Sequence, residues 1–250
     1  MLSDTEIWRG WLDWLPTAQP SVDPRHFFGQ YQVHLVAHGL TESAATQRLN
    51  RIRRMMRTNA DGWALMFDNI YANPTPAFQT LPNRLLVNAV AGITAGRALD
   101  ISAGQGRNAL FLAQAGWDVT AVDVSEVGLQ VAARNAQEAG VQLRTACQNW
   151  QEFDYGTNCW DLLVLTYTSV PLTQAEMVAR LTDALSPTGM LVVETYASEE
   201  DAPTRRPVDL DPVRLRSAWS HITIKHFEDR AAQSDWDQQP TRLVRMITVK

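Results

Sequence analysis

Residues 97–125 read RALDISAGQGRNALFLAQAGWDVTAVDVS, and this stretch decides the fold. A short apolar segment carries one carboxylate, Asp100, and a turn of small residues with Gly104 and Gly106 follows it. A helical run and a second apolar segment then end at another carboxylate, Asp123. The pattern predicts a strand–turn–helix–strand unit, with one acid at the end of each of two parallel strands.

The turn in this unit predicts a bound nucleoside. Glycine lets the backbone pass close to a ligand where a Cβ would collide. The turn also leads into a helix N-terminus, whose free N–H groups favour a nearby anionic group. Asp123 stands where folds of this kind bind ribose hydroxyls. We therefore expect a nucleoside-containing cofactor at the carboxyl ends of the strands.

Two cofactors fit the glycine spacing. Gly104-x-Gly106-x-x-Ala109, with Asp123 beyond it, matches the dinucleotide pattern, so an NAD(P)-dependent oxidoreductase is one alternative. Asp100 favours S-adenosylmethionine, because a carboxylate there attracts the cationic amino group of a methionine moiety and repels a pyrophosphate. A strand pair, rather than a second nucleotide-binding half, ends the chain. A non-catalytic S-adenosylmethionine-binding module is the other alternative.

The run from Gly104 to Ala113, GQGRNALFLA, resembles motif I of class I S-adenosylmethionine-dependent methyltransferases. It is most similar to the small-molecule branch that includes the tellurite-resistance and thiopurine methyltransferases. The resemblance covers roughly residues 60–250, and Ser102 stands where the family has its first glycine. It implies a doubly wound, mostly parallel, seven-stranded α/β sheet of the Rossmann-like methyltransferase type. It also implies methyl transfer to a small molecule, with a thiol or another soft S, Se or Te nucleophile favoured as acceptor.

Position along the chain assigns the expected cofactor contacts. Asp100 should meet the methionine amino group, and Asp123 should bind both ribose hydroxyls. Arg107 could reach a carboxylate of cofactor or substrate, with a surface salt bridge as the alternative. After the third strand the family carries an acid and an apolar residue that bind adenine, and this chain has Asn149 and Trp150. The other expected cofactor-binding residues are Ser102, Gly104, Gly106, Val124 and Thr166.

Three tyrosines are the expected residues on the substrate side. Tyr167 follows the fourth strand, whose end faces the methyl group in the family fold, and Tyr196 ends the fifth strand. Tyr71, from a helix before the main body, is expected to close over the cofactor. Each is interpreted as a pocket wall more than as a proton-transfer group. A hydroxyl acceptor would need a general base, whereas a thiolate would not.

Two domains are predicted, an N-terminal helical cap over residues 1–72 and the cofactor-binding domain over residues 73–250. Ser3 with Glu6 forms a capping-box pattern that begins the first helix. Further helices are expected to begin at Asp23-Pro24, Thr41, Ala60, Pro82, Ser125, Thr173 and Asp211-Pro212. After Asp123, strands are expected at Val141–Ala146, Asp161–Leu165, Met190–Thr195, Ile222–Asp229 and Thr241–Val249, the last two antiparallel.

Composition limits the class of partner. The formal net charge of −5, without a basic block, argues against a nucleic-acid substrate. Two cysteines suggest a reducing compartment, and neither a signal peptide nor a membrane-length apolar run is evident. His34 and His38 share a helix face but lack a third ligand, so no metal is expected. We expect a cytoplasmic monomer or homodimer that acts on a small molecule and does not bind a membrane.

Overall fold

The computed structural model describes residues 2–19, 21, 24–56, 58–73, 78–198 and 208–250. Contacts within the chain separate it into two compact units. The first contains residues 1–78 and the short segment 124–128, and the second contains residues 79–123 and 129–250. Each unit has its own buried core.

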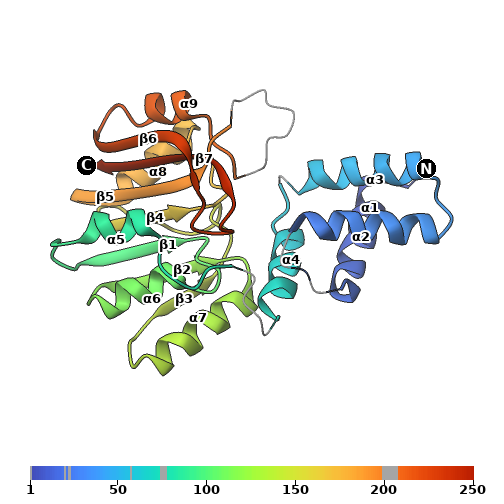
Figure 1. The fold of residues 1–250 in the computed structure, drawn as a ribbon, viewed down its shortest axis with the longest axis horizontal. Helices are drawn as coiled ribbons and strands as arrows, with labels where there is room; N and C mark the ends of the chain where they lie inside the picture. The colour runs from blue at the N-terminus through green and yellow to red at the C-terminus, as the bar shows by residue number, and fades with distance from the viewer. Residues whose placement is uncertain (1, 20, 22–23, 57, 74–77, 199–207) are drawn as a thin grey trace. The chain divides into compact units, whose positions relative to one another are not determined.

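The second unit is built on a seven-stranded sheet in the order β3-β2-β1-β4-β5-β7-β6 (Figure 1). Its strands are β1 (Arg97–Ile101), β2 (Asp118–Asp123), β3 (Arg144–Cys147), β4 (Trp160–Thr166), β5 (Leu185–Tyr196), β6 (Thr223–Gln233) and β7 (Pro240–Val249). Strands β1 to β5 pair in parallel, and β7 runs antiparallel between β5 and β6. This confirms the predicted Rossmann-like methyltransferase sheet and its reversed final hairpin.

Two apolar layers cover the sheet, one on each face. Leu99 and Leu163 belong to the layer that also contains side chains of α8 (Ala175–Ala184) and α9 (Pro212–Ala218). Their neighbours Ala98 and Leu162 belong to the opposite layer, with α5 (Arg84–Val90), α6 (Arg107–Gln114) and α7 (Glu126–Glu138). Because both faces are buried, the central strands are continuous apolar runs, as is typical of parallel sheets.

The described part of the first unit contains the α-helices α1 (Asp4–Trp14), α2 (Pro24–Ala37), α3 (Glu42–Met55) and α4 (Asp61–Tyr71), and a short 3₁₀ helix, η1 (Leu15–Thr17). Trp11 is fully buried and packs against Trp14, Phe28 and Tyr31, with ring centroids 5.4, 5.3 and 5.1 Å away. Aromatic rings at these separations form the core that joins α1 to α2. Within the described ranges, no helix of either unit is long and apolar enough to cross a bilayer.

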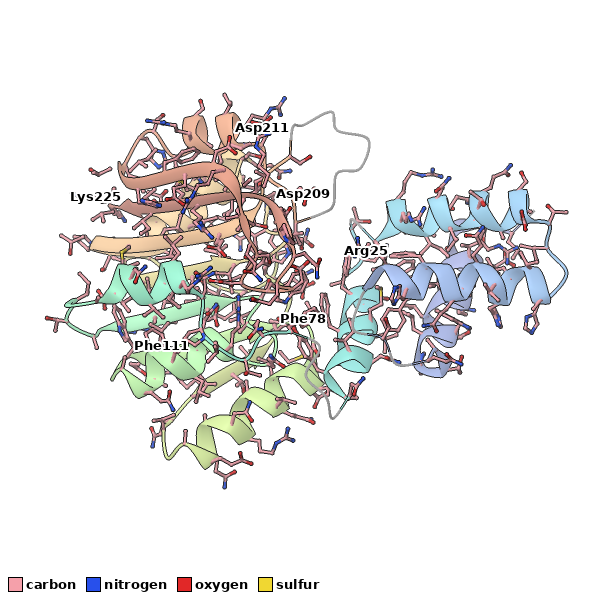
Figure 2. All side chains as sticks on the ribbon, viewed as in Figure 1. Arg25, Phe78, Phe111, Asp209, Asp211 and Lys225 are labelled. Carbon is pink, nitrogen blue, oxygen red and sulfur yellow. The ribbon has the colours of Figure 1, made fainter. Side chains whose placement is uncertain are left out.

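Local capping signals fix most helix starts as predicted. Ser3 and Glu6 form the reciprocal capping box of α1, with Ser3 N donating to Glu6 Oε2 at 2.7 Å. Thr41 caps α3. Asp211, labelled in Figure 2, begins α9. Its side chain accepts hydrogen bonds from the backbone N–H groups of Val213 and Arg214. The expected cap of α2, Asp23, lies outside the described residues.

Three strand boundaries were predicted wrongly, and one of them is the end of β6, which lies at Gln233 and not at Asp229. β3 begins at Arg144, because Val141 N donates to Ala136 O at 3.0 Å and so completes the end of α7. β5 begins at Leu185, five residues before the predicted start at Met190, because the Ser186-Pro187-Thr188-Gly189 segment, which we expected to form a turn, lies within the strand; its pairing with β4 contains an irregularity there. Thr188 within this irregularity has a φ of 77°. The turn chemistry was recognised, but the strand continues through it.

Candidate active site

The carboxyl ends of β1 and β2 bring two acids and the glycine turn together. The two strands pair in parallel over their length, so Asp100, near the end of β1, lies beside the end of β2, where Asp123 is the last residue. Both side chains are buried. Gly104, with a φ of 54°, donates its N–H to Asp123 Oδ2 at 2.8 Å. The turn and the second acid therefore hold each other in place.

Gly106 has a different structural reason to be glycine. Its φ is 78°, and it caps α6 in the left-handed conformation. A Cβ at this position would lie 2.5 Å from Ala132 Cβ on α7. Even a methyl group would therefore separate α6 from α7, whatever ligand is bound.

Ser102 occupies the position where the family has glycine, and the backbone explains that preference. Its φ is 62°, in the left-handed region that costs a non-glycine residue about 1–2 kcal/mol. The Ser102 hydroxyl forms a hydrogen bond of 2.8 Å with the Thr168 hydroxyl, just beyond β4. Serine thus adopts the glycine conformation and links the turn to the next strand.

Asp100 is a buried carboxyl group with few hydrogen-bond donors around it. It is 2% exposed and accepts a hydrogen bond from Ala109 N at 3.1 Å. Burial raises its pKa to about 7, and Asp123 adds to the rise, while Arg107 and the Ala109 amide oppose it. A carboxylate in this condition favours a cation as its neighbour.

Arg107, the first residue of α6, presents a buried donor with no partner. The residue is 9% exposed, and Nη1 donates to the carbonyl oxygens of Asp235 at 2.6 Å and Leu81 at 3.3 Å. Nη2 is buried and has no hydrogen-bond partner among the described residues. Because an unpaired buried donor is costly, this atom is suited to an anionic group of a ligand.

Tyr167 lies directly after β4, at a φ of 54°, and its hydroxyl is fully engaged. It donates to Glu194 Oε1 at 2.5 Å and accepts from Asp235 N at 3.0 Å. Glu194 has no exposed surface and also accepts from Asn83 Nδ2 at 2.8 Å and Arg245 Nε at 2.6 Å. Burial, followed by the Glu194 charge, raises the pKa of Tyr167 far above its ordinary value.

The other expected residue on the substrate side in this unit is Tyr196. Its hydroxyl donates to Asp237 Oδ2 at 2.8 Å, and its ring lies 5.2 Å from that of Tyr167. Thr166, at the end of β4, accepts a bond of 3.0 Å from Asn108 Nδ2. These side chains line the carboxyl ends of β4 and β5.

The expected adenine-binding pair follows β3. Asn149 uses its side chain locally, because its Oδ1 accepts from Gln151 N and its Nδ2 donates to Gln151 Oε1, both at 3.1 Å. Trp150 is half-buried and packs on the apolar layer beneath α8 and α9. Gln148 N donates to Asp123 O at 3.0 Å, which ties this segment to the end of β2.

Tyr71 and Val124 belong to the first unit. The Tyr71 ring stacks on Phe67 at 5.9 Å and meets Phe78 edge-on at 6.1 Å. It also lies against Gly128 at the start of α7, where a Cβ would come within 2.8 Å of the ring. The remaining expected site residues belong to the second unit.

His34 and His38 form a ring pair, with centroids 4.1 Å apart. His38 Nδ1 lies 2.8 Å from His34 O, so one ring nitrogen is used within the helix. The described residues contain no cluster of three side chains suited to a metal ion.

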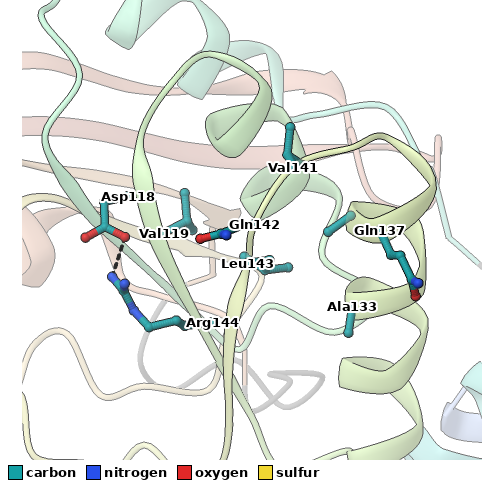
Figure 3. Close-up of a pocket in the computed structure, with 9 residues that line it drawn as sticks. Asp118, Val119, Ala133, Gln137, Val141, Gln142, Leu143 and Arg144 are labelled. Carbon is teal, nitrogen blue, oxygen red and sulfur yellow. Dashed lines mark ion pairs between the residues drawn. The ribbon is translucent and has the colours of Figure 1, made fainter.

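A cavity of about 360 Å³ lies between α7 and the starts of β2 and β3 (Figure 3). Asp118, Gln137 and Arg144 are among its lining residues, and Asp118 forms an ion pair with Arg144. In a parallel sheet the starts of the strands are opposite the ends that carry Asp100 and Asp123. The cavity is therefore separate from the candidate active site.

The sequence did not identify the residues of the β6–β7 turn that approach this site. Asp235, 7% exposed, accepts from Arg84 N at 2.8 Å and Arg84 Nε at 3.1 Å. Trp236 stacks on Tyr167, with ring centroids 5.6 Å apart and an interplanar angle of 22°. No motif marks these residues, because they reach the site only through the fold of the hairpin.

Residues 98–189 match the family model described as a methyltransferase domain. Residues 98–189 are therefore a methyltransferase domain. This finding agrees with the predicted methyltransferase activity and with S-adenosylmethionine as its cofactor. The side chains of the methyltransferase domain fit this cofactor, since Asp100 accepts a hydrogen bond from a backbone amide alone and Arg107 Nη2 has no hydrogen-bond partner among the described residues, while the methionine moiety offers an ammonium group and a carboxylate.

Solved structures with the fold of this methyltransferase domain include TehB from Haemophilus influenzae, at a TM-score of 0.60 and 16% identity over 75% of this chain and 66% of that one. A structure described for the conversion of a disulfide bond into a thioacetal group in echinomycin biosynthesis has a TM-score of 0.58 and 17% identity, over 75% and 92%. The 1,6-didemethyltoxoflavin-N1-methyltransferase from Burkholderia thailandensis has a TM-score of 0.51 and 21% identity, over 66% and 76%.

At these identities the similarity establishes the fold alone. The chain spans 66% of the length of the Haemophilus protein. No curated protein sequence matches the chain at a significant level.

Proposed function

We propose that the protein moves the methyl group of S-adenosylmethionine to a small molecule whose acceptor atom is a soft nucleophile such as sulfur, selenium or tellurium. The observation that carries the proposal is that buried Asp100 accepts a hydrogen bond from a backbone amide alone, while buried Arg107 Nη2 has no hydrogen-bond partner among the described residues. The bound cofactor supplies an electrophilic methyl group on a good leaving group.

The proposed contacts follow from charge. Asp100 holds the amino group of the methionine moiety, and Arg107 Nη2 holds its carboxylate. Asp123 binds the ribose hydroxyls, with one carboxylate oxygen already fixed by Gly104 N. The other residues that we propose to contact the cofactor are Ser102, Gly106, Val124, Thr166, Asn149 and Trp150. These contacts orient the cofactor so that its methyl group faces the acceptor.

The hydroxyl groups on the substrate side favour an acceptor that needs no general base. Tyr167 donates to Glu194, and its raised pKa keeps it protonated at neutral pH. Tyr196 donates to Asp237. Neither tyrosine is therefore suited to remove a proton, and we propose both as pocket walls, together with Tyr71. An acceptor that ionises near neutral pH, such as a thiolate or selenide, can be methylated without a base.

A panel of acceptors tests this function. The full-length protein is incubated with S-adenosylmethionine and sulfide, selenite, tellurite, thiols or phenols, and release of S-adenosylhomocysteine is measured. We expect release with one or more soft acceptors and none with phenols. Release with phenols alone would overturn the soft-acceptor proposal.

The cofactor is tested separately from the acceptor. Calorimetry compares the binding of S-adenosylhomocysteine with that of NAD(H), and we expect binding of the former only. Binding without release of product from any acceptor would instead support a non-catalytic module. Binding of NAD(H) alone would support the oxidoreductase alternative.

We also propose that the helices of residues 1–72 act as a cap that supplies part of the acceptor pocket. The support is their aromatic content, ahead of a complete cofactor-binding fold. Deletion of residues 1–60 should lower turnover of the true acceptor and leave S-adenosylhomocysteine binding intact. Unchanged turnover would refute the cap.

A further inference from the structure

Asp235, in the turn between β6 and β7, uses its carboxylate to hold the start of α5. The side chain is buried, and it accepts from Arg84 N at 2.8 Å and from Arg84 Nε at 3.1 Å. Asn83, which caps the same helix, has its Nδ2 3.5 Å from Asp235 Oδ2. The hairpin turn and the start of α5 are therefore fixed to each other by one buried charged group.

The main chain of Asp235 contacts two further residues of the candidate site. Its carbonyl oxygen accepts from Arg107 Nη1 at 2.6 Å, and its N–H donates to the Tyr167 hydroxyl at 3.0 Å. The second acceptor of Arg107 Nη1 is Leu81 O, at 3.3 Å, just before the cap of α5. The Asp235 carboxylate thus connects the two chain segments whose carbonyl groups hold Arg107.

These two carbonyl groups fix the direction of the Arg107 guanidinium. Both accept from Nη1, and the Tyr167 ring centroid lies 6.0 Å from Cζ. Because the guanidinium group is planar and rigid, the bonds to Nη1 also set the position of Nη2. Nη2 is buried and has no hydrogen-bond partner among the described residues, so a donor is held in place without an acceptor from that part of the chain.

We propose that Asp235 is a positioning residue that orients Arg107 toward the carboxylate of the methionine moiety. The inference rests on the proposed function, in which Arg107 Nη2 holds that carboxylate. Asp235 acts through its own carbonyl group and through the start of α5, so loss of its carboxylate loosens Arg107 and leaves the contacts of Asp100 and Asp123 in place. Asp235 therefore affects the recognition of one group of the cofactor and not of the others.

The test compares two ligands that differ in one carboxylate. S-adenosylhomocysteine carries an ammonium group and a carboxylate, whereas decarboxylated S-adenosylhomocysteine carries the ammonium group alone. Calorimetry in one buffer measures the affinity of each ligand for the full-length protein, and the ratio of the two affinities reports the carboxylate contact. We expect S-adenosylhomocysteine to bind the wild type about ten- to hundredfold more tightly, as one charge-assisted hydrogen bond allows.

Two substitutions of Asp235 test its carboxylate. Asp235→Ala should lower the affinity ratio about three- to tenfold and leave the affinity for the decarboxylated ligand unchanged, which also shows that the variant is folded. Asp235→Asn keeps an acceptor for Arg84 N and loses the bond to Arg84 Nε, so it should lower the ratio only about twofold. This conservative variant tests the same link if Asp235→Ala does not fold.

Two further variants show whether Asp235 acts through Arg107. Arg107→Met should abolish the preference for the carboxylate, and adding Asp235→Ala to it should have no further effect, because the two residues act as one unit. Asp229→Ala is the matched control, since Asp229 is an acid of the same hairpin that binds Arg242, with both bonds at 2.7 Å. This control should keep the full affinity ratio.

Each outcome decides the inference. An unchanged ratio in both Asp235 variants, beside a lowered ratio in Arg107→Met, overturns the positioning role and leaves the proposed carboxylate contact standing. An unchanged ratio in Arg107→Met overturns both. Equal weakening of the two ligands by Asp235→Ala, or a lowered ratio in Asp229→Ala, also overturns the positioning role.

Turnover of the acceptor panel with S-adenosylmethionine is measured in parallel. If the affinity ratio depends on Asp235 through Arg107 but no acceptor is methylated, the positioning inference stands and the proposed reaction fails.

Discussion

Asp100 predicts that cofactor binding depends on pH near neutrality. Its pKa of about 7 in the ligand-free protein means that roughly one tenth of the carboxyls are ionised at pH 6 and about nine tenths at pH 8. Only the ionised form attracts the ammonium group of S-adenosylhomocysteine, which stays protonated over this range. Affinity should therefore rise about tenfold from pH 6 to pH 8, about 1.4 kcal/mol.

The sign follows from the proton count. The free protein holds the Asp100 proton more tightly than the complex does, so binding releases a proton and is favoured as pH rises. Calorimetry of S-adenosylhomocysteine in two buffers of different ionisation enthalpy measures this release, which should be about half a proton at pH 7. Asp100→Asn should bind more weakly and without the pH slope.

Two charged neighbours of Asp100 should shift the midpoint of the pH dependence of S-adenosylhomocysteine affinity in opposite directions. The Arg107 charge lowers the pKa of Asp100, so Arg107→Met should shift the midpoint to higher pH. The Asp123 charge raises the pKa of Asp100, so Asp123→Asn should shift the midpoint to lower pH. Equal affinity at pH 6 and pH 8 in the wild type, without proton release, would refute the assignment of Asp100 to the amino group.

Three further changes test other parts of the structure. Gly106→Ala should lower the free energy of unfolding in urea by about 3 kcal/mol, because of backbone strain and the clash with α7. Gly140 has a φ of 70° but nothing near its Cβ position, so Gly140→Ala should lower this free energy by about 1 kcal/mol. Equal losses in the two variants would contradict the packing argument. Tyr167→Phe removes a hydrogen-bond donor from Glu194 and should lower the free energy of unfolding by about 1–3 kcal/mol. It should lower kcat for a thiol acceptor by less than about tenfold. A loss of about a hundredfold or more in kcat would mean that the hydroxyl transfers a proton in the reaction. Asp123→Ala should weaken S-adenosylhomocysteine binding about 10- to 100-fold by calorimetry, and an unchanged Kd would remove the ribose contact.

Local signals explain why much of the fold was predictable. The Ser3–Glu6 capping box, the Thr41 cap and the alternation of apolar runs all act within a few residues of one another. The start of β3 was not predictable in this way, because Val141 completes the end of α7 before the strand begins. Edge strands make few core contacts, so their apolar pattern is weak.

In the candidate site, too, residues that are close in sequence were predicted and residues that meet through long-range contacts were not. Asp100, the glycine turn and Asp123 are close in sequence, and their spacing alone brought them together. The bonds from Asn83 to Glu194 and from Arg107 to Asp235 join residues 111 and 128 positions apart. No periodicity or motif connects such pairs, and only the closure of β7 between β5 and β6 places them side by side.

Two buried acids in the second unit support the proposal that the cofactor site is at the end of β1. Glu194 receives a hydroxyl, an amide and a guanidinium, so its charge is compensated within the protein and its role is to hold Tyr167 and Arg245. Asp100 accepts a hydrogen bond from one backbone amide. The Arg107 charge lowers the pKa of Asp100, but not enough to offset the increase caused by burial. A buried carboxyl that the protein itself does not neutralise is costly to ionise. A ligand that supplies a cation would remove this cost, and for this reason we propose Asp100, and not Glu194, as the acid that binds the cofactor.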